Sequence, residues 1–406
     1  MENKKNIWII NQYTGSPHYG MNYRSYYLAK ELVSEGDSVT VFAGSYSHLF
    51  SHYPKTDGLF AKESIDDIDY IWVKTPKYKS SKSIGRVFSM LVFMINLFFF
   101  NIFKMKKPDV IIISSLSLFP ILNAYIWAKI FKIEFIFEVR DIWPLTLIEV
   151  GNMSKYHPLV LFLGLFEKLG YKKAKYVVSV LPNAKEHMVS RGMNENKFRY
   201  IPNGVNLEEV QNYQEVSNEN KSLLPKNKFI VGYVGTLGIV NAMEYFLDAA
   251  KKLKDNSQIH FVIVGKGGEK SKLQEYCKAN ELSNVTFIDP IPKIEVQSML
   301  KLLDVCWIGA YKHEIYKYGV SANKLFDYMY AAKPIIYSIK SGEDLITMAN
   351  CGISIEAENS EKIKEAILQL SEMNKDELER MGENGKKYVI INHSYVKLAK
   401  IYRELF

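Results

Sequence analysis

The chain is poor in cysteine and lacks the marks of an exported protein. Its 406 residues include only three cysteines, Cys277, Cys306 and Cys351. Their wide spacing excludes a disulfide framework and the paired pattern of a zinc site. The N-terminal residues lead directly into an apolar strand and contain no apolar stretch as long as a secretory signal. We therefore expect the protein to remain in the reducing cytoplasm.

The chain is also too long for one ordinary core and too apolar to be disordered. With 48% apolar and 24% charged residues, 406 residues suggest two folded domains. Residues 1–205 contain 26 Lys and Arg against 17 Asp and Glu, whereas the remainder contains 26 against 27. A basic first half indicates an anionic partner, either a membrane surface or a phosphorylated lipid. Nucleic acid is the rival, but the chain has no aromatic and basic platform at a recognisable spacing.

Apolar runs alternate with helical patterns along both halves, which predicts an α/β fold with Rossmann-like units. The first unit opens with a strand at 7–10, a glycine-containing loop and a helix, without the G-x-G-x-x-G dinucleotide fingerprint. Residues 206–228 are polar and lack periodicity, so we expect a linker there. We thus predict an N-terminal domain at 1–205, a C-terminal domain at 229–390, and a last helix within 391–406 that packs back on the first domain.

A strongly apolar helix is expected near 84–103. Residues 87–103 include only three polar side chains, and on a helix Lys82, Arg86, Ser89 and Asn96 share a narrow stripe. A buried core helix and a transmembrane span are both open, although the stretch falls just short of the roughly 20 residues that a span needs. Basic residues stand at both ends of the stretch, Lys82 and Arg86 at the first end and lysines at 104, 106 and 107 at the second. We therefore favour a helix partly submerged in an anionic membrane face.

The most informative stretch is 318–334, YGVSANKLFDYMYAAKP, where a short loop enters an amphipathic helix. The first turn of a helix offers unpaired N–H groups and a positive dipole end, which suit a diphosphate. Lys324 adds a cation there, and Asp327 can accept hydrogen bonds from ribose hydroxyls. An ordinary capped helix between two strands is the alternative.

Five segments carry a family resemblance. They are 138–144 (EVRDIWP), 197–206 (KFRYIPNGVN), 232–238 (GYVGTLG), 264–270 (VGKGGEK) and 323–336 (NKLFDYMYAAKPII). In this order they resemble the family-4 retaining glycosyltransferases of the GT-B fold, and most of all the capsule and O-antigen branch that includes N-acetyl-fucosamine transferases. The resemblance implies two Rossmann-like domains facing across a cleft, with a sugar nucleotide on the C-terminal domain and an acceptor on the N-terminal one.

The resemblance also implies roles for individual residues. Arg140 and Asp141 fall on the cleft motif and take electrostatic and positional roles, because the family is read as front-face attack assisted by the departing phosphate. The first loop is expected to face the acceptor through Gly15, His18, Tyr19, Gly20 and Arg24. The donor is expected to contact Gly235, Thr236, Gly238, Gly265, Lys312, Gly319, Val320, Ser321, Asn323, Lys324 and Asp327.

The chain departs from the family pattern at three of these positions. Gly319 stands where the family's first acidic residue is usual, and Thr236 where many members carry a phosphate-binding Arg. Arg140 replaces a common histidine. Charge for the diphosphate must come from elsewhere, and Lys324, Arg140 and Lys312 are the candidates. No D-x-D follows a strand in the manner of metal-dependent transferases, so we expect no metal and no other cofactor.

The resulting hypothesis is a metal-independent glycosyltransferase of the hexosyl or N-acetylhexosaminyl type, peripheral on the cytoplasmic face of the inner membrane. It would move a sugar, N-acetylated or deoxy, from a UDP-sugar to a polyprenyl-diphosphate-linked glycan in surface polysaccharide synthesis, without nucleic acid. Two alternatives stay open. One is a sugar-nucleotide 2-epimerase on a similar fold, and the other is a non-catalytic subunit that anchors another transferase at the membrane.

Overall fold

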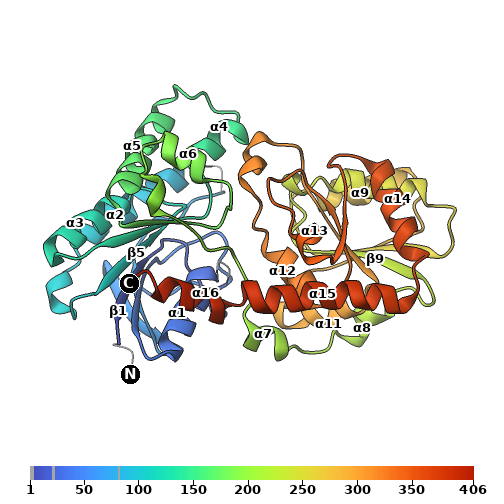
Figure 1. Cartoon of the computed structure of the whole chain (residues 1–406), viewed down its shortest axis with the longest axis horizontal. Helices are drawn as coiled ribbons and strands as arrows, with labels where there is room; N and C mark the ends of the chain where they lie inside the picture. Colours follow the sequence, from blue (N-terminus) through green and yellow to red (C-terminus); the bar gives the residue numbers. More distant parts are fainter. Residues whose placement is uncertain (1–3, 21–22, 81–82) are drawn as a thin grey trace. The chain divides into compact units, whose positions relative to one another are not determined.

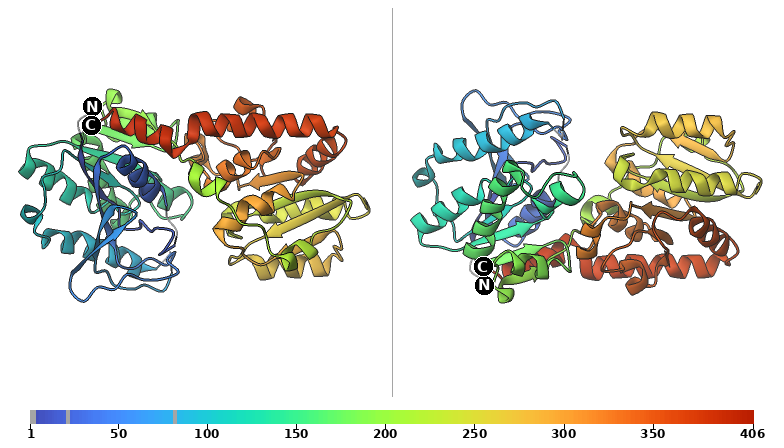
Figure 2. Two further views of the ribbon diagram at one scale, coloured as in Figure 1. Left: turned by 90° about the horizontal axis from the view of Figure 1, so that it is seen from below. Right: turned by 90° about the horizontal axis from the view of Figure 1, so that it is seen from above.

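The chain folds into two compact units. The computed structural model describes residues 4–20, 23–80 and 83–406. Unit 1 comprises Met1–Pro202 with Tyr395–Phe406, and unit 2 comprises Asn203–Ser394. In each unit helices lie on both faces of a largely parallel sheet (Figures 1 and 2). The predicted α/β class with two Rossmann-like domains is confirmed.

Unit 1 is built on an eight-stranded sheet in the order β3-β4-β2-β1-β5-β6-β7-β8. Every neighbouring pair is parallel except β3 with β4. Chain order reverses between β1 and β5, so the loops after these two strands flank a topological switch point. The strands are β1 (Asn6–Ile10), β2 (Ser38–Gly44), β3 (Phe60–Ile65), β4 (Ile68–Val73), β5 (Val110–Ser114), β6 (Phe135–Val139), β7 (Tyr176–Ser179) and β8 (Phe198–Tyr200).

Alternate residues of β1 point to opposite faces of this sheet, and a helical layer covers each face. Ile7 and Ile9 pack in one core with α1 (Arg24–Ser34) and α16 (Tyr395–Arg403). Trp8 makes edge contacts with Trp127 of α3 (Ile121–Phe131) on the other face. The remaining helices are α2 (Ile84–Phe98), η1 (Ile102–Lys104), α4 (Leu145–Glu149), α5 (Pro158–Lys173), α6 (Lys185–Ser190) and η2 (Glu195–Lys197).

The last helix of the chain belongs to unit 1 although its sequence follows unit 2. Tyr395 of α16 packs on Tyr27 of α1 with ring centroids 5.0 Å apart. The division falls after Ser394 rather than after residue 390, and the first division falls after Pro202 rather than after residue 205.

Unit 2 contains six parallel strands in the order β11-β10-β9-β12-β13-β14. Chain order reverses between β9 and β12, the position at which open α/β sheets bind ligands beyond the carboxyl ends of the strands. The strands are β9 (Phe229–Val234), β10 (Ile259–Val264), β11 (Val285–Ile288), β12 (Val305–Gly309), β13 (Ile335–Ser338) and β14 (Gly352–Ser354).

Two helical layers enclose the sheet of unit 2, each with its own buried core. One layer holds α9 (Met243–Lys252), α10 (Lys270–Ala279) and α14 (Ser360–Ser371). The other holds α11 (Val296–Lys301), α12 (Asn323–Tyr330), α13 (Leu345–Ala349) and α15 (Lys375–His393). Three short turns, η3 (Ile239–Asn241), η4 (Lys293–Glu295) and η5 (Glu314–Tyr318), lie in the connecting loops.

The segment 206–228 is not a free linker, contrary to expectation. It forms α7 (Leu207–Gln211) and α8 (Asn218–Ser222), and it belongs to unit 2. Val210 and Val216 are buried in the unit 2 core. Polar residues separate these two anchors, so the segment shows no periodicity in sequence although it is packed.

The apolar helix α2 turns its polar stripe toward the protein. Ser89 is fully buried, Asn96 donates to the Lys74 carbonyl, and the Arg86 guanidinium lies 5.0 Å from the centre of the Tyr13 ring. Lys82, the fourth residue of the predicted stripe, lies outside the described residues. The outer surface of α2 and the turn that follows exposes large apolar side chains: Ile84, Phe88, Ile95, Phe98, Phe99 and Phe103. In the described part of the chain, no helix is both long enough and apolar enough to cross a membrane.

Candidate functional site

Two glycine loops interlock at the carboxyl edge of the unit 2 sheet. Leu237 donates its amide to the Lys266 carbonyl at 2.9 Å, which ties the loop after β9 to the loop after β10. Gly265 has a φ of +148°, and a Cβ added there would lie 2.0 Å from the Gly235 carbonyl oxygen. Only glycine fits this crossing. This crossing fixes the Gly235 backbone, whose amide donates to the Val264 carbonyl at 3.0 Å, at the switch point where the donor loop is predicted.

Lys324 reaches this loop from the first turn of α12. Its Nζ donates to the Tyr233 hydroxyl at 2.5 Å and to Asn241 Oδ1 at 2.8 Å. Tyr233 and Asn241 in turn both donate to the carbonyl of Thr236, at 2.7 and 2.9 Å. A Cβ on Gly235 would lie 3.3 Å from Lys324 Cε, so the glycine leaves room for the lysine. The network places a cation beside Thr236, where the family's usual Arg is absent.

The ammonium group of Lys324 has polar neighbours but no carboxylate among its described contacts. Burial lowers the pKa of Lys324 to about 7, because the charged form loses hydration without gaining an anion. Its Nζ also lies 4.4 Å from the centre of the Tyr233 ring. A bound diphosphate would supply the missing negative charge and restore the protonated form.

The N-terminus of α12 is open to a ligand. The helix begins at exposed Asn323, and no side chain caps it at Ala322. Ser321 is anchored by Asn203, whose backbone amide donates to Ser321 Oγ at 3.1 Å and whose side chain donates to the Ser321 carbonyl at 2.8 Å. The first-turn amides of α12 thus stand next to Lys324, an arrangement that favours phosphate.

Not every backbone amide predicted to contact the donor is available. Gly319 has a φ of +112°, which explains the glycine, but its amide donates to the Tyr316 carbonyl at 2.9 Å. The Gly319 amide is therefore not available to hydrogen-bond the nucleotide sugar. Val320 and Ser321, both partly buried, follow it in the loop that leads to α12. Gly238 immediately precedes the short turn η3, and Thr236 is exposed.

Two predicted charged residues have partners in the chain. Both carboxylate oxygens of Asp327 accept from Lys293 Nζ, at 2.7 and 2.8 Å. Lys312 is exposed and paired with Glu356 at 2.9 Å. The Glu356 hydrogen bond raises the pKa of Lys312, so this lysine keeps its positive charge. The carboxylate of Glu356 balances that charge. Of the cations predicted for the diphosphate, Lys324 is the one that the unit 2 fold brings to the glycine loop.

In unit 1, Arg140 and Asp141 directly follow β6 at the carboxyl edge of the sheet. Arg140 donates its amide to Ser115 Oγ at 3.0 Å, and Ser115 follows β5. Asp141 is exposed and Arg140 partly buried. The two side chains therefore leave the sheet at the edge where the loop after β1 also lies.

The loop after β1 is held by its own contacts. The Gly15 carbonyl accepts from the Tyr70 hydroxyl at 3.0 Å, and Gly20 has a φ of +113°. Tyr19 is buried and donates to the Glu63 carboxylate at 2.9 Å. Burial, with help from Glu63, raises the pKa of Tyr19 to about 12, so its hydroxyl stays a donor. His18, one of the loop residues predicted to face the acceptor substrate, is exposed to solvent.

Arg24 does not face an acceptor as expected. It is 4% exposed, and its Nε donates to Glu138 Oε1 at 2.9 Å. Its two terminal nitrogens donate to the carbonyls of Ile201 and Pro202. A guanidinium bound in this way joins β6 to the segment at Ile201 and Pro202, and its burial keeps it from a ligand in solution.

Sequence reasoning missed four residues that hold the predicted ones. Tyr233 and Asn241 position Lys324, Asn203 positions Ser321, and Lys293 pairs with Asp327. Tyr233 and Asn203 lie within the sequence motifs at 232–238 and 197–206. Their position in these motifs is the sequence signal that could have identified them. Among the described side chains, no group of three or more His, Cys, Asp or Glu residues is arranged to hold a metal ion.

Comparisons with known proteins bear on both units. Residues 19–209 match the family described as Glycosyltransferase Family 4, and residues 215–388 match Glycosyl transferases group 1. An uncharacterized glycosyltransferase of Methanocaldococcus jannaschii is 26% identical over 76% of this chain and 77% of its own length. The putative colanic acid biosynthesis glycosyl transferase WcaI of Escherichia coli is 24% identical over 58% of this chain and 59% of its own.

Solved structures share the whole fold. Sucrose-phosphate synthase from Thermosynechococcus elongatus superposes with a TM-score of 0.75 at 17% identity, over 99% of each chain. Anabaena HepE in complex with UDP-glucose gives a TM-score of 0.66 at 13% identity, over 98% of each chain. The chain is therefore a glycosyltransferase of the GT-B fold, with a family 4 domain followed by a group 1 domain.

Proposed function

We propose that the protein transfers a sugar from a UDP-sugar to a lipid-linked glycan, with retention of configuration and without a metal. The observation that carries this proposal is the Lys324 network, which sets a cation without a carboxylate partner among the described residues beside a glycine loop and an open helix start. A leaving diphosphate needs stabilised charge, and a cation with helix amides supplies it.

The nucleotide is proposed from the next turn of α12. Asp327 stands one turn after Lys324, and its carboxylate, which accepts from Lys293, has lone pairs left to accept from the ribose hydroxyls as well. HepE, which shares the fold, is described in complex with UDP-glucose, and this supports a UDP-sugar here. Because position 319 is a glycine, no carboxylate there can select a particular sugar hydroxyl. We therefore propose the sugar only as a hexose or as an N-acetylated or deoxy relative of one.

The acceptor is proposed from unit 1. WcaI is named for colanic acid biosynthesis, which supports a role in surface polysaccharide synthesis. The exposed apolar side chains of α2, with Lys104, Lys106 and Lys107 exposed just beyond, suit the interface of an anionic membrane. The protein would thus work peripherally on the cytoplasmic face of the inner membrane, where a polyprenyl-diphosphate-linked glycan is presented.

We expect Asp327→Asn to raise the KM for the UDP-sugar by about 10- to 100-fold, because hydrogen bonds to a charged group contribute about 1.5–3 kcal/mol. UDP release and sugar transfer to membrane-extracted acceptor measure this, with and without excess chelator, and chelator should leave turnover unchanged. Lys293→Met is the matched control because it removes the ion pair and keeps the carboxylate.

Three outcomes would contradict the proposal. Equal losses in Asp327→Asn and Lys293→Met would reduce Asp327 to a structural role. Epimerised donor without sugar transfer would favour a 2-epimerase. Absence of both products with every nucleotide sugar tested would favour a non-catalytic partner subunit.

The membrane role predicts a second result. Replacing Phe88, Phe99 and Phe103 with Ser should reduce co-sedimentation with anionic vesicles about tenfold or more, because the three rings are 59%, 68% and 74% exposed and face outward. Exposed rings contribute little to the core, so the melting temperature should stay within a few degrees. A matched control replaces exposed Leu223, Ile239 and Met348 of unit 2 with Ser. Unchanged sedimentation in the unit 1 variant would exclude α2 as the membrane contact.

A further inference from the structure

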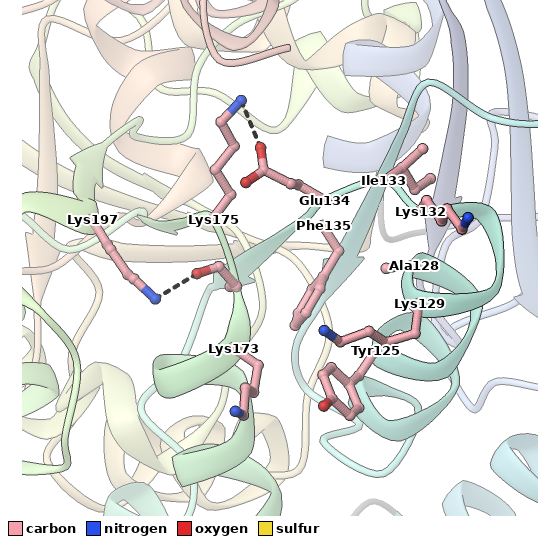
Figure 3. Close-up of a pocket in the computed structure, with 11 residues that line it drawn as sticks. Tyr125, Ala128, Lys129, Lys132, Ile133, Glu134, Phe135, Lys173, Lys175 and Lys197 are labelled. Atoms are coloured by element: carbon pink, nitrogen blue, oxygen red, sulfur yellow. Dashed lines mark hydrogen bonds and ion pairs between the residues drawn. The ribbon is translucent and has the colours of Figure 1, made fainter.

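A basic pocket of about 540 Å³ opens in unit 1 where β6 and β7 begin. Figure 3 shows Tyr125 and Lys129 of α3 on one side, Lys173 and Lys197 on the other, and Phe135 between them. The volume lies in the range of small-molecule sites, which is roughly 300–1,000 Å³. The lining includes five lysines and one carboxylate: Lys129, Lys132, Lys173, Lys175, Lys197 and Glu134.

Positive charge in this pocket exceeds what the chain neutralises. Glu134 pairs with Lys175 at 2.9 Å. In the residues that the structure describes, no carboxylate lies within ion-pair distance of Lys129, Lys132 or Lys173. Burial lowers the pKa of Lys197, and the nearby charge of Lys173 acts in the same direction. The lysines thus repel one another in the absence of an anion.

Helix ends explain only part of this cluster. Carbonyl groups at the C-terminus of a helix attract cations, and α3 and α5 both end here. Lys197 already serves the end of α5, because its Nζ donates to the carbonyls of Lys172 and Ala174 at 2.9 and 2.8 Å. Lys129 and Lys173 remain as exposed ammonium groups on opposite walls of the pocket.

The pocket is separate from the acceptor edge of unit 1. Phe135 begins β6 and lines the pocket, whereas Arg140 follows the last residue of the same strand. Five strand residues span roughly 16 Å. A ligand in the pocket therefore lies at the opposite edge of the sheet from the residues proposed to act in sugar transfer.

We propose that this pocket binds a phosphate-bearing anion, with Lys129 and Lys173 contacting the phosphate and with Tyr125 and Phe135 contacting the adjoining part of the ligand. Lysine binds phosphate as a point charge, and two or more are needed to balance a phosphomonoester or a diphosphate. The phosphate could belong to a lipid headgroup or to a soluble compound.

The experiment compares two double variants of equal charge change. Lys129→Gln with Lys173→Gln removes the pocket cations, and Lys55→Gln with Lys62→Gln removes two exposed lysines elsewhere in unit 1. Calorimetric titration with pyrophosphate is done in the Lys324→Met background, so that the unit 2 site does not contribute. Sedimentation with phosphatidylglycerol and with phosphatidylcholine vesicles gives the lipid arm.

We expect the pocket variant to weaken pyrophosphate binding about tenfold or more and the control variant to change it less than twofold, with both folded by melting temperature. Loss of phosphatidylglycerol binding in the pocket variant assigns the phosphate to a lipid headgroup, and unchanged vesicle binding assigns it to a soluble compound. The proposal is overturned if pyrophosphate does not bind the parent protein, or if the two double variants bind it equally. Neither result bears on sugar transfer, which is assayed separately.

Discussion

Replacing Lys324 with Met should lower kcat/KM for the sugar nucleotide by about 100- to 1,000-fold, the usual cost of removing one group that stabilises developing charge. Lys324 is the cation that the unit 2 fold brings to the glycine loop, held there by Tyr233 and Asn241. Lys333→Met is the matched control, since Lys333 follows the C-terminal end of the same helix and burial also lowers its pKa. The control should stay within about threefold of the parent.

The same lysine predicts how donor binding depends on pH. In the free protein Lys324 titrates near pH 7, and a bound diphosphate favours the protonated form, so its pKa is higher in the complex. The contribution of Lys324, measured as the ratio of the UDP affinities of the parent and Lys324→Met, should therefore be constant below pH 7 and decrease above it, by up to about tenfold per pH unit until the pKa of the complex is reached. Calorimetric titration of UDP between pH 6 and 9 measures the slope. A profile that is the same in Lys324→Met would assign the pH dependence to another group.

The departures from the family pattern at Thr236 and Gly319 differ in what unit 2 offers in their place. Thr236 lacks a charged side chain, yet its carbonyl is part of the network that holds Lys324. Gly319 lacks a carboxylate, and its positive φ shows that the backbone there takes a path that a side chain would strain. In the proposed function Lys324 takes the phosphate role in place of the family's Arg, while no residue is proposed to replace the acid at Gly319.

The order of strands and helices could be predicted from the sequence because buried parallel strands read as continuous apolar runs. The runs at 230–234 and 260–264 coincide with β9 and β10 to within a residue. The glycine loops after them follow from the same pattern. Lys324 could be named because its motif fixes its place at the start of α12.

Side-chain partners could not be predicted, because they come from distant parts of the chain. Asp327 meets Lys293, 34 residues earlier, and Arg24 meets Glu138, 114 residues later. The stripe on α2 shows the same limit. Periodicity identified its polar side, but only packing showed that this side faces the protein and the apolar side faces outward.

The pair formed by Arg24 and Glu138 carries the largest expected effect on stability. Arg24→Met should cost about 3–5 kcal/mol, because it leaves the Glu138 carboxylate, 1% exposed, buried without its cation. Glu138→Gln should cost a similar amount, since it leaves the Arg24 guanidinium, 4% exposed, buried without its carboxylate partner. At about 2–4 °C per kcal/mol for a unit of this size, unit 1 should melt about 6–20 °C lower. Differential scanning calorimetry measures the shift.

The double variant separates a buried ion pair from two independent contacts. Removing both charges in Arg24→Met with Glu138→Gln leaves neither the guanidinium nor the carboxylate, so the double variant should be less destabilised than the two single variants added together. Additive losses would mean that the two groups do not interact. If Arg24 contacted the acceptor instead, Arg24→Met would raise the KM for the acceptor and leave the melting temperature of unit 1 unchanged. The bonds of Arg24 to Glu138, Ile201 and Pro202 favour the opposite result. We expect Arg24→Met to lower the melting temperature and to leave the KM for the acceptor unchanged at temperatures where the variant is folded.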